Sequence, residues 1–452
     1  MLSARRLAPL PLLALTAAAA CSSNQTTSGT TSSAATTTGA GGSTTTATTT
    51  AGTGGSTATT TTTTGTGGSG GSAPHGCQAF ALSGDPDAPV DATVPPASAG
   101  GLAWDGTHYE AVYTGTVPTG FNVYLTLLGP KGAIVSPPGM QSLSLIGSDA
   151  TGGPVVAAGN RQGVLWSDRR TGDYEIFFAA LQGNGVKLWD DLRLSNAKGF
   201  SINPTLAFTG SEHVAIWQDD RGGDFHLFGQ RITMDGMLTA GNVELTMPPA
   251  GTGDQAPSAA AGDGGLGVAY IEKGPAGSTL VFRLIAADLT PAAPPPITVE
   301  DAMGTPGAPV VVWDFDRYVI AWQDTDAPSK AIRAMAVGPD GATLVPPTEV
   351  TVPGAHASRA PALLALGDSL LLVYADDRDQ NGGFEIYART LSLSLAPLSD
   401  ELRVTSAMGD SLGPKVAMGP GGATGEAGIL FQDNRAGGQN NIFFARLVCK
   451  GP

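Results

Sequence analysis

A short pattern recurs seven times between residues 77 and 452, and its spacing restricts the possible folds more than any other feature of the chain. Each copy contains an aromatic residue at the end of an apolar run. These residues are Tyr113, Trp166, Trp217, Tyr270, Trp322, Tyr374 and Phe431. Successive positions lie 53, 51, 53, 52, 52 and 57 residues apart. A near-constant period of about 52 residues is typical of chains built from one repeated supersecondary unit.

Each repeat is interpreted as four short strands separated by turn residues. In the second repeat the segments are 154–158, 164–166, 176–178 and 192–194, and in the fifth repeat the fourth strand is expected at 350–352. Seven units of four antiparallel strands predict an all-β chain forming a seven-bladed β-propeller, with the aromatic residues buried between blades. A β-sandwich or an open solenoid is the alternative, and closure of the ring distinguishes them.

The N-terminus has the features of an export signal. Two arginines precede the apolar stretch 7–17, which is too short to span a bilayer and suits a signal peptide. Three alanines and Cys21 follow, and this arrangement resembles the lipobox of bacterial lipoproteins, although Ala18 departs from the usual Leu. The resemblance implies a signal peptide at 1–20, acylation of Cys21 and, with Ser22 rather than Asp next, an outer-membrane lipoprotein. Ordinary cleavage near Ala20, which would leave a free thiol, is the alternative.

Residues 21–76 are expected to form a disordered tether. Between residues 22 and 75, 50 of 54 residues are Ser, Thr, Gly or Ala, and none is charged. Such a segment cannot bury enough apolar surface to offset the entropy lost on ordering. The propeller would therefore occupy residues 77–452 and be held to a membrane through the lipid anchor alone.

The two ends of the repeat region are expected to complete one blade. The last repeat supplies three strands, and the segment 78–83 resembles a fourth strand placed ahead of the first repeat. Antiparallel pairing of 78–83 with 442–447 would close the ring and remove exposed sheet edges. Cys77 and Cys449 would then meet, and an exported chain permits a disulfide between them. Two unrelated thiols are the alternative.

The clearest repeats begin at Trp166 and Trp217 and follow the pattern Trp-x-Asp-x-Arg-x-Gly. They resemble the repeats of exported bacterial β-propellers with Trp-x-Asp-x-Arg-x-Gly-x-x-x-Ile-Tyr units, which are similar in style to TolB-type propellers. The resemblance covers about residues 77–452 and implies a propeller that acts as a binding platform. TolB carries an additional α/β domain that this sequence lacks, so its partners are not carried over.

The Asp and Arg of this pattern occupy the connection from the second to the third strand in four repeats. The residues are Asp168, Arg170, Asp219, Arg221, Asp376, Arg378, Asp433 and Arg435. An aspartate can accept hydrogen bonds from loop amides, and an arginine can donate in a fork to an acid or a carbonyl. Recurrence in four blades favours a turn clamp within each blade. The alternative is a polar ring on one face that grips an extended ligand.

Other features of the sequence limit its chemistry. The net charge of −15 makes nucleic-acid binding unfavourable. The acidic pairs Asp85/Asp87, Asp314/Asp316 and Asp324/Asp326 could bind Ca²⁺, but they lack EF-hand spacing, and solvated turns are the favoured interpretation. The five histidines, at positions 75, 108, 213, 226 and 356, have no zinc-site spacing, and no catalytic motif or cofactor site is recognised.

The sequence therefore favours a membrane-anchored envelope lipoprotein whose propeller is a non-catalytic binding platform for a protein or polysaccharide. The alternative is a carbohydrate-active propeller enzyme, either a glycosidase or a lyase. That alternative predicts a deep acidic pocket with carboxylates about 5–10 Å apart. A structural component of the envelope without a dedicated ligand is a third possibility.

Overall fold

The computed structural model describes residues 76–451, except 85, 87–88, 92–96, 137–138, 291–294, 300–304, 326–329, 353, 355, 380–382 and 436–437. The expected signal peptide (1–20), Cys21 and all but the last residue of the expected tether (21–76) lie outside these residues. The regular elements of the described residues are β-strands and one short 3-10 helix, Gly422–Thr424. No helix in this part of the chain is long and apolar enough to cross a membrane.

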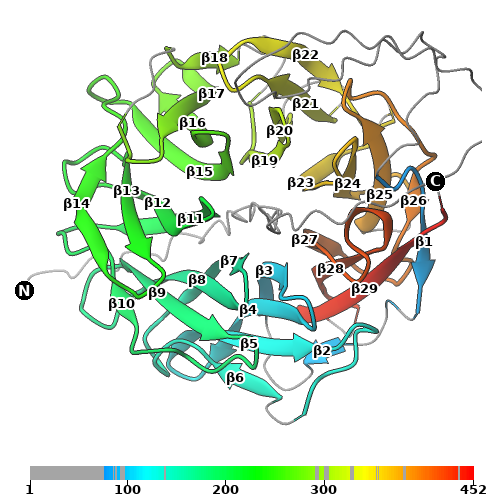
Figure 1. The fold of residues 1–452 in the computed structure, drawn as a ribbon, viewed down its shortest axis with the longest axis horizontal. Helices are drawn as coiled ribbons and strands as arrows, with labels where there is room; N and C mark the ends of the chain where they lie inside the picture. Colours follow the sequence, from blue (N-terminus) through cyan, green and yellow to red (C-terminus); the bar gives the residue numbers. More distant parts are fainter. Residues whose placement is uncertain are drawn as a thin grey trace, which may run out of the picture. The chain divides into compact units, whose positions relative to one another are not determined.

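Seven antiparallel sheets surround a common centre, as Figure 1 shows, and form the predicted seven-bladed β-propeller. Blade 1 contains β3 (Ala97–Trp104), β4 (Tyr109–Val117), β5 (Gly120–Leu128) and β6 (Met140–Ser142). Blade 2 contains β7 (Thr151–Ala158), β8 (Arg161–Asp168), β9 (Glu175–Gln182) and β10 (Leu192–Arg193). Blade 3 contains β11 (Ser201–Phe208), β12 (Glu212–Asp219), β13 (His226–Thr233) and β14 (Leu238–Glu244).

The next three blades repeat the same order of strands. Blade 4 contains β15 (Gly253–Gly262), β16 (Gly265–Gly274), β17 (Gly277–Ala286) and β18 (Ile297–Val299). Blade 5 contains β19 (Val310–Asp314), β20 (Arg317–Gln323), β21 (Ile332–Val337) and β22 (Thr343–Glu349). Blade 6 contains β23 (Ser358–Ala365), β24 (Ser369–Asp376), β25 (Glu385–Ser392) and β26 (Leu402–Arg403). The fourth strand of blade 5 ends at Glu349, so its predicted position at 350–352 was wrong.

Blade 7 is built from both ends of the repeat region. It contains β27 (Ser411–Met418), β28 (Glu426–Asp433) and β29 (Asn441–Cys449), and β29 pairs with β1 (Phe80–Ser83) and β2 (Pro89–Asp91). The predicted pairing of 78–83 with 442–447 was wrong in register. Segment 80–83 lies opposite 446–449, and the short strand β2 lies opposite Ile442 and Phe443. The outer strand therefore has two pieces.

Cys77 and Cys449 form a disulfide at this seam, with their Cα atoms 5.7 Å apart, as the sequence predicted. The innermost strands of neighbouring blades contact one another around the ring, and β27 of blade 7 contacts β3 of blade 1. The ring is therefore closed, which excludes the open solenoid and the sandwich.

The core lies between blades, because each sheet is buried on both faces by its neighbours. Trp166 of blade 2 packs in one cluster with Val112 and Val123 of blade 1, and Trp217 of blade 3 packs with Leu165 of blade 2. All seven repeat aromatics are less than one-tenth exposed. Their burial confirms the prediction that the aromatic residue of each repeat lies between blades.

A β-bulge interrupts the first strand of several blades. In two cases the residue that follows the repeat aromatic of the preceding blade is a glutamine, and its side chain binds the bulge. In blade 4 the register shifts between Gln255 and Ser258, and Ala256 has a φ of 51°. The backbone N–H of Ala256 donates to Oε1 of Gln218, which follows Trp217 in blade 3. Blade 6 repeats the contact between Ala360 and a glutamine of blade 5. The glutamine thus satisfies a buried amide of the next blade.

Candidate functional site

One face of the propeller gathers the predicted site residues. In every blade the second strand ends, and the first and third strands begin, at this face, as the antiparallel pairing requires. The connections from the second to the third strand therefore lie on the same face as the connections from each blade to the next. We call this the clamp face, because the Asp and Arg of the repeat pattern lie along it.

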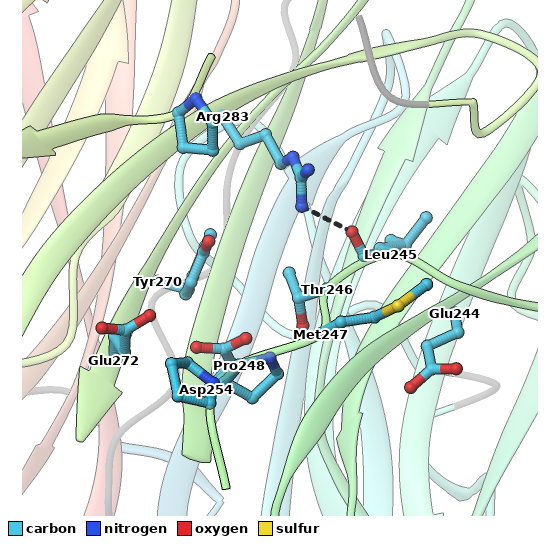
Figure 2. A pocket seen from close by; sticks show the side chains of 11 residues that line it. Glu244, Leu245, Thr246, Met247, Pro248, Asp254, Tyr270, Glu272 and Arg283 are labelled. Carbon is cyan, nitrogen blue, oxygen red and sulfur yellow. Dashed lines mark hydrogen bonds between the residues drawn. The ribbon is translucent and has the colours of Figure 1, made fainter. Parts of the chain in front are cut away.

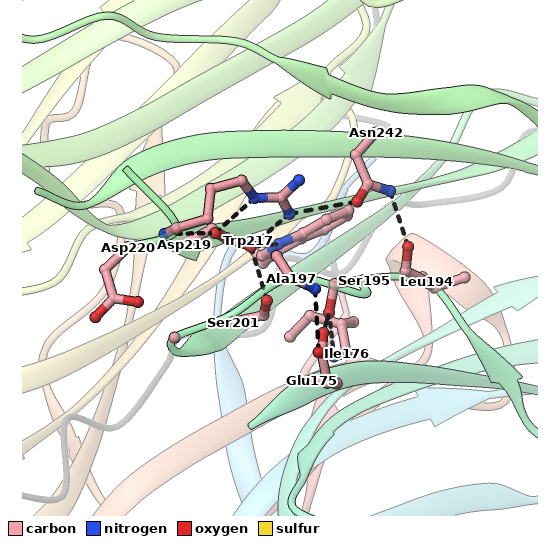
Figure 3. A network of polar contacts seen from close by, with 12 residues as sticks. Glu175, Ile176, Leu194, Ser195, Ala197, Ser201, Trp217, Asp219, Asp220 and Asn242 are labelled. Atoms are coloured by element: carbon pink, nitrogen blue, oxygen red, sulfur yellow. Dashed lines mark hydrogen bonds and ion pairs between the residues drawn. The ribbon is translucent and has the colours of Figure 1, made fainter. Parts of the chain in front are cut away.

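In blade 3 the aspartate of the pattern is the centre of a compact hydrogen-bond network (Figure 3). The Asp219 carboxylate accepts hydrogen bonds from Ser201 Oγ (2.7 Å), Trp217 Nε1 (3.1 Å) and Arg221 Nη2 (2.6 Å). The guanidinium of Arg221 also lies over the ring of Phe228, 4.0 Å from its centre.

Burial acts to raise the pKa of Asp219, but the hydrogen bonds from Arg221 and Ser201 lower it overall. The aspartate is therefore held as an anion by groups of its own blade.

The contacts of the aspartate with its arginine and its serine recur in the other three blades that carry the pattern. The aspartate–arginine–serine sets are Asp168/Arg170/Ser148, Asp376/Arg378/Ser358 and Asp433/Arg435/Ser411. In each set the guanidinium lies over an aromatic ring of the third strand. The predicted pairs are thus brought together within blades, and the serines are partners that the sequence interpretation missed. All but Ser148 open the first strand of a blade, a recurring position that could have shown them.

Three of the arginines reach a further acceptor near the fourth strand. Arg170 Nη1 donates to Asp191 (2.8 Å), Arg378 Nη1 donates to Glu401, and Arg221 Nη2 contacts Asn242 (3.3 Å). Each acceptor stands three residues before the buried aliphatic residue that follows the fourth strand. Those aliphatic residues are Leu194, Leu245 and Val404. This outer acceptor could have been found by aligning the repeats on that residue.

A second buried network lies beside the clamp in two blades. Glu175 of blade 2 is buried and accepts hydrogen bonds from Ser195 Oγ and Arg193 Nη2. Blade 6 has the same arrangement with Glu385, Thr405 and Arg403. In blade 3 His226 stands in place of the glutamate, and its Nδ1 atom is in hydrogen-bond contact with Glu244 Oε1. Polar side chains therefore pair across the strands at this position in all three blades.

Blade 4 departs from the clamp and contains a pocket of about 320 Å³ instead (Figure 2). The pocket lies between the outer part of blade 3 and the strands of blade 4. It is lined by Glu244, Leu245, Thr246, Met247, Pro248, Pro249, Asp254, Tyr270, Glu272, Arg283 and Pro296. We call it the blade-4 pocket. Its walls combine three acids with apolar side chains, and Arg283 donates from one side to the carbonyl oxygen of Leu245 (2.7 Å).

Asp254 is the most perturbed acid of the blade-4 pocket. Its side chain is 1% exposed, and its Oδ1 atom has no hydrogen-bond partner. Burial raises the pKa of Asp254 to about 6, with a hydrogen bond from Thr246 acting against the rise and the charge of Glu272 adding to it. Asp254 and Glu272 are direct cross-strand neighbours on β15 and β16. Neither residue was among the predicted site residues, because neither belongs to a complete copy of the pattern.

A second, more open hollow of about 630 Å³ lies between blades 1 and 2. Leu145 and Ile146 line it together with Arg169 and the Asp149 carboxylate, which lies 3.7 Å from that arginine. Exposed apolar side chains continue along the connections between blades. They are Leu145, Ile146, Phe200, Met247, Val352 and Met408. The clamp face therefore carries apolar groups outside the hydrogen-bonded clamps.

The acidic pairs noted in the sequence are not uniformly in solvated turns. Asp314 and Asp324 are buried, so the interpretation as solvated turns was wrong for them. Burial raises the pKa of Asp314 to about 7. Asp316 is exposed and pairs with Arg317, whereas Asp85, Asp87 and Asp326 lie outside the described residues.

One group of described residues has metal-ligand geometry. A nitrogen of His356 and carboxylate oxygens of Asp376 and Asp377 lie within 4.8 Å of one another. Asp376 already accepts hydrogen bonds from Ser358 and Arg378 as part of its clamp. Both carboxylate oxygens of Asp376 therefore already accept a hydrogen bond from the guanidinium. His213, in contrast, is buried against Phe178 and Phe208, and burial lowers its pKa to about 4.

No protein-family model matches the chain, and no curated protein has significant sequence similarity to it. Among solved structures, the β-propeller domain of the trilobed protease from Pyrococcus furiosus matches 78% of this chain over 94% of its own length, with a TM-score of 0.48 and 7% identity. An endo-arabinase from Bacteroides thetaiotaomicron matches 63% of this chain over 88% of its own length, with a TM-score of 0.36 and 12% identity.

One of a pair of prolyl endopeptidases matches 78% of this chain with a TM-score of 0.43 and 14% identity. This chain spans about half the length of that protein. All three similarities are too distant to carry an activity to this chain. The closed ring of seven antiparallel blades defines it as a β-propeller protein.

Proposed function

We propose that the chain is an outer-membrane lipoprotein, anchored through acylated Cys21, whose propeller is a non-catalytic binding platform at the cell envelope. The signal-like segment 1–20 and the uncharged segment 21–76 support export and tethering. The propeller would bind through its clamp face. The anchor gives the membrane as one partner, and the ligand of the clamp face is the other.

The observation that carries the binding role is the composition of the connections between blades. Met247 is 81% exposed and Met408 is 85% exposed, and Leu145, Ile146 and Phe200 are exposed on the same face. Exposed apolar side chains also occur on the opposite face. Those of the clamp face lie in the connections between blades beside the hydrogen-bonded clamps, and loops held on a rigid scaffold commonly form interaction surfaces. The clamps satisfy the polar groups beneath these connections and hold them in place.

A protein ligand fits this surface better than a polysaccharide does. Exposed methionine and aliphatic side chains adapt to apolar protein surfaces, and methionine is enriched in protein interfaces. Sugar hydroxyls would instead need many unsatisfied polar side chains. The clamp carboxylates are already bonded within their own blades.

The binding face is tested by paired surface variants of the full chain displayed in a bacterial envelope. Ile146→Ser with Phe200→Ser and Met408→Ser should abolish chemical crosslinking to envelope proteins. The control variant, Ile134→Ser with Val186→Ser and Met237→Ser, changes exposed apolar residues of the opposite face and should retain it. Equal crosslinking by both variants would contradict the assignment of the face. If the clamp-face variant kept its crosslinking to envelope proteins but lost binding to a purified envelope polysaccharide, the ligand would be a polysaccharide.

A carbohydrate-active enzyme is the second candidate, and Asp254 is the observation that favours it. A carboxyl group with a pKa of about 6 beside a second carboxylate can act as an acid near neutral pH. This candidate predicts release of reducing ends from an oligosaccharide panel by the native chain and loss of release in Asp254→Asn. Equal release by the native chain and the variant would exclude Asp254 as the acid.

A further inference from the structure

Blade 4 retains an acid at the aspartate position of the pattern but has no clamp arginine. Glu272 follows Tyr270 at the spacing at which Asp219 follows Trp217, and Gly274 stands where Arg221 stands in blade 3. Lys273 is exposed and does not line the pocket. The anionic half of the clamp is therefore present without its cationic half.

The serine of the clamp is also replaced by an acid in blade 4. Ser201 pairs with Asp219 in the register of blade 3, and Asp254 pairs with Glu272 in the same register of blade 4. A serine donates a hydrogen bond to the clamp aspartate, whereas a carboxylate repels it. Two carboxylates thus face each other where clamp blades place a hydroxyl, a carboxylate and a guanidinium.

The space for a guanidinium remains in blade 4. Val281 occupies the third-strand position of Phe228, over which the clamp arginine lies, and Pro296 occupies the position of the outer acceptor Asn242. The smaller valine and the missing arginine leave the blade-4 pocket. Tyr270, Glu272 and Pro296, which correspond to three contacts of a clamp arginine, all line it.

The other blades without the complete pattern differ from blade 4. Blade 5 keeps Asp324 at the acid position, but Arg333 stands on its third strand where clamp blades have the aromatic residue. Blade 1 has Gly115 at the acid position. Blade 4 therefore combines retained acids with no arginine of its own at either clamp position.

The charges of the blade-4 pocket favour an incoming cation. Oδ1 of Asp254 is buried without a hydrogen-bond partner, and a buried, unpaired polar atom is unfavourable. Glu272 stands opposite Asp254, while His226 is paired with Glu244. Arg283 is the cation that lines the pocket, and its Nη1 donates to a backbone carbonyl.

We propose that the blade-4 pocket binds an arginine side chain of a protein partner, whose guanidinium takes the place of the missing clamp arginine between Asp254 and Glu272. The inference rests on the proposed binding function, because it names a contact of the same face. A guanidinium can donate to both carboxylates, and its methylene groups would contact Met247, Pro248 and Pro296. A single metal ion would leave most of the 320 Å³ unfilled, since one water takes about 30 Å³.

The first test measures small probes against the full chain in detergent by calorimetry. N-acetyl-arginine amide should bind at least tenfold more tightly than N-acetyl-citrulline amide, which has nearly the same shape without the charge. N-acetyl-lysine amide should bind more weakly than the arginine probe, because a lysine lacks the planar fork. Equal binding of the arginine and citrulline probes would overturn the proposal. Tighter binding of Ca²⁺ than of the arginine probe would also overturn it and would identify a metal site.

The second test fills the pocket from within the chain. Gly274→Arg restores the arginine of the pattern, and the backbone there needs no left-handed conformation, the nearest atom to an added Cβ being Thr252 Oγ1 at 3.2 Å. This variant should bind the arginine probe at least tenfold more weakly. Ala276→Arg adds the same charge at the exposed hairpin tip and should bind as the native chain does. Unchanged binding by Gly274→Arg would overturn the proposal.

A third variant separates loss of the site from loss of the fold. Asp254→Ser restores the residue type that clamp blades carry, so the domain should stay folded while binding of the arginine probe falls at least tenfold. Native binding by a folded Asp254→Ser variant would contradict the role of Asp254. If the clamp-face triple variant still crosslinked to envelope proteins while the native chain bound the arginine probe, the proposed platform would be rejected and the arginine site would stand. If Gly274→Arg crosslinked to envelope proteins as the native chain does, the arginine site would be rejected as a partner contact and the platform would stand.

Discussion

At the scale of single residues, the clamp arginines and aspartates stabilise each other within a blade. Asp219 is 1% exposed and bonds to Arg221, Ser201 and Trp217, while Arg221 also covers the ring of Phe228. A carboxylate buried in this way depends on its cation. The repeated sequence pattern is accounted for by these contacts without any ligand.

Replacing the clamp arginine of blade 3 should therefore destabilise the propeller. Arg221→Ala should lower the free energy of unfolding by about 1–3 kcal/mol, because Asp219 keeps its charge and loses its strongest partner. Arg221 is partly exposed, which limits the loss. Denaturant unfolding measures the effect, and Arg169→Ala, which changes an exposed arginine of blade 2, should stay within about 0.5 kcal/mol of the native chain. Unchanged stability in Arg221→Ala would show that the pair is not a clamp.

Asp254 should make the stability of the native chain fall as the pH rises. Its pKa in the folded state is about 6, above the value of about 3.9 expected in the unfolded chain. The folded state therefore binds more protons between these values, and stability is lost as the pH rises from about 4 to about 6. The groups that contribute to this shift or line the same pocket are Glu272, Glu244, His226, Arg283 and Thr246.

The variant Asp254→Ser removes this titration. Its melting temperature should match the native value near pH 4 and exceed it at pH 7, because the native chain alone must ionise a buried carboxyl at the higher pH. Asp235→Ser changes an exposed acid and should show no pH-dependent difference from the native chain. Thermal unfolding from pH 4 to pH 8 measures all three. A melting temperature of Asp254→Ser below the native value at pH 7 would show that ionised Asp254 is stabilising.

At the scale of elements, the repeat period was enough to predict the number of blades, the order of their strands and the burial of the aromatic residues. These follow from periodicity, since a unit with two apolar faces must pack against its neighbours. The strand pairing at the seam was predicted in the wrong register. The two short strands β1 and β2 share one outer position, and their pairing depends on loop geometry that the local sequence pattern does not contain.

The blade-4 pocket could not be predicted from the complete copies of the pattern. It arises from four departures in one blade, at Asp254, Gly274, Val281 and Pro296, each of which appears as simple divergence when considered alone. Only the register of β15 with β16 shows that Asp254 replaces a clamp serine. Burial then turns a common surface residue into a carboxyl of raised pKa.

Contacts between elements also explain which residues vary together among the blades. Three of the four blades with the clamp arginine have Asp191, Asn242 or Glu401 as outer acceptor, whereas blade 4 has Pro296. Rebuilding both positions in blade 4 should therefore be cooperative. In a double-mutant cycle, Gly274→Arg and Pro296→Asp should couple favourably by about 0.5–2 kcal/mol in the free energy of unfolding. A coupling energy of zero would show that the outer acceptor does not engage the arginine.

At the scale of the whole molecule, the proposed anchor depends on one cysteine. Cys21→Ala should release the protein from the membrane fraction, because no acyl chain would then be attached. Ser22→Ala, which leaves the cysteine in place, should remain with the membranes. Fractionation in detergent-free buffer followed by immunoblotting measures both. A Cys21→Ala variant that still sediments with membranes would show that the chain is held there by something other than the lipid.

The disulfide at the seam of blade 7 should govern opening of the ring. Cys77 and Cys449 are 372 residues apart, so their bond constrains nearly the entire unfolded propeller. In the chain-entropy model a loop of this length is worth about 6 kcal/mol, although measured effects are often smaller. Cys77→Ser with Cys449→Ser should therefore lower the melting temperature and expose Phe443, opposite β2, to hydrogen exchange before the strands of blades 3 and 4. Uniform exchange across all seven blades would show that the ring unfolds without opening first at this seam.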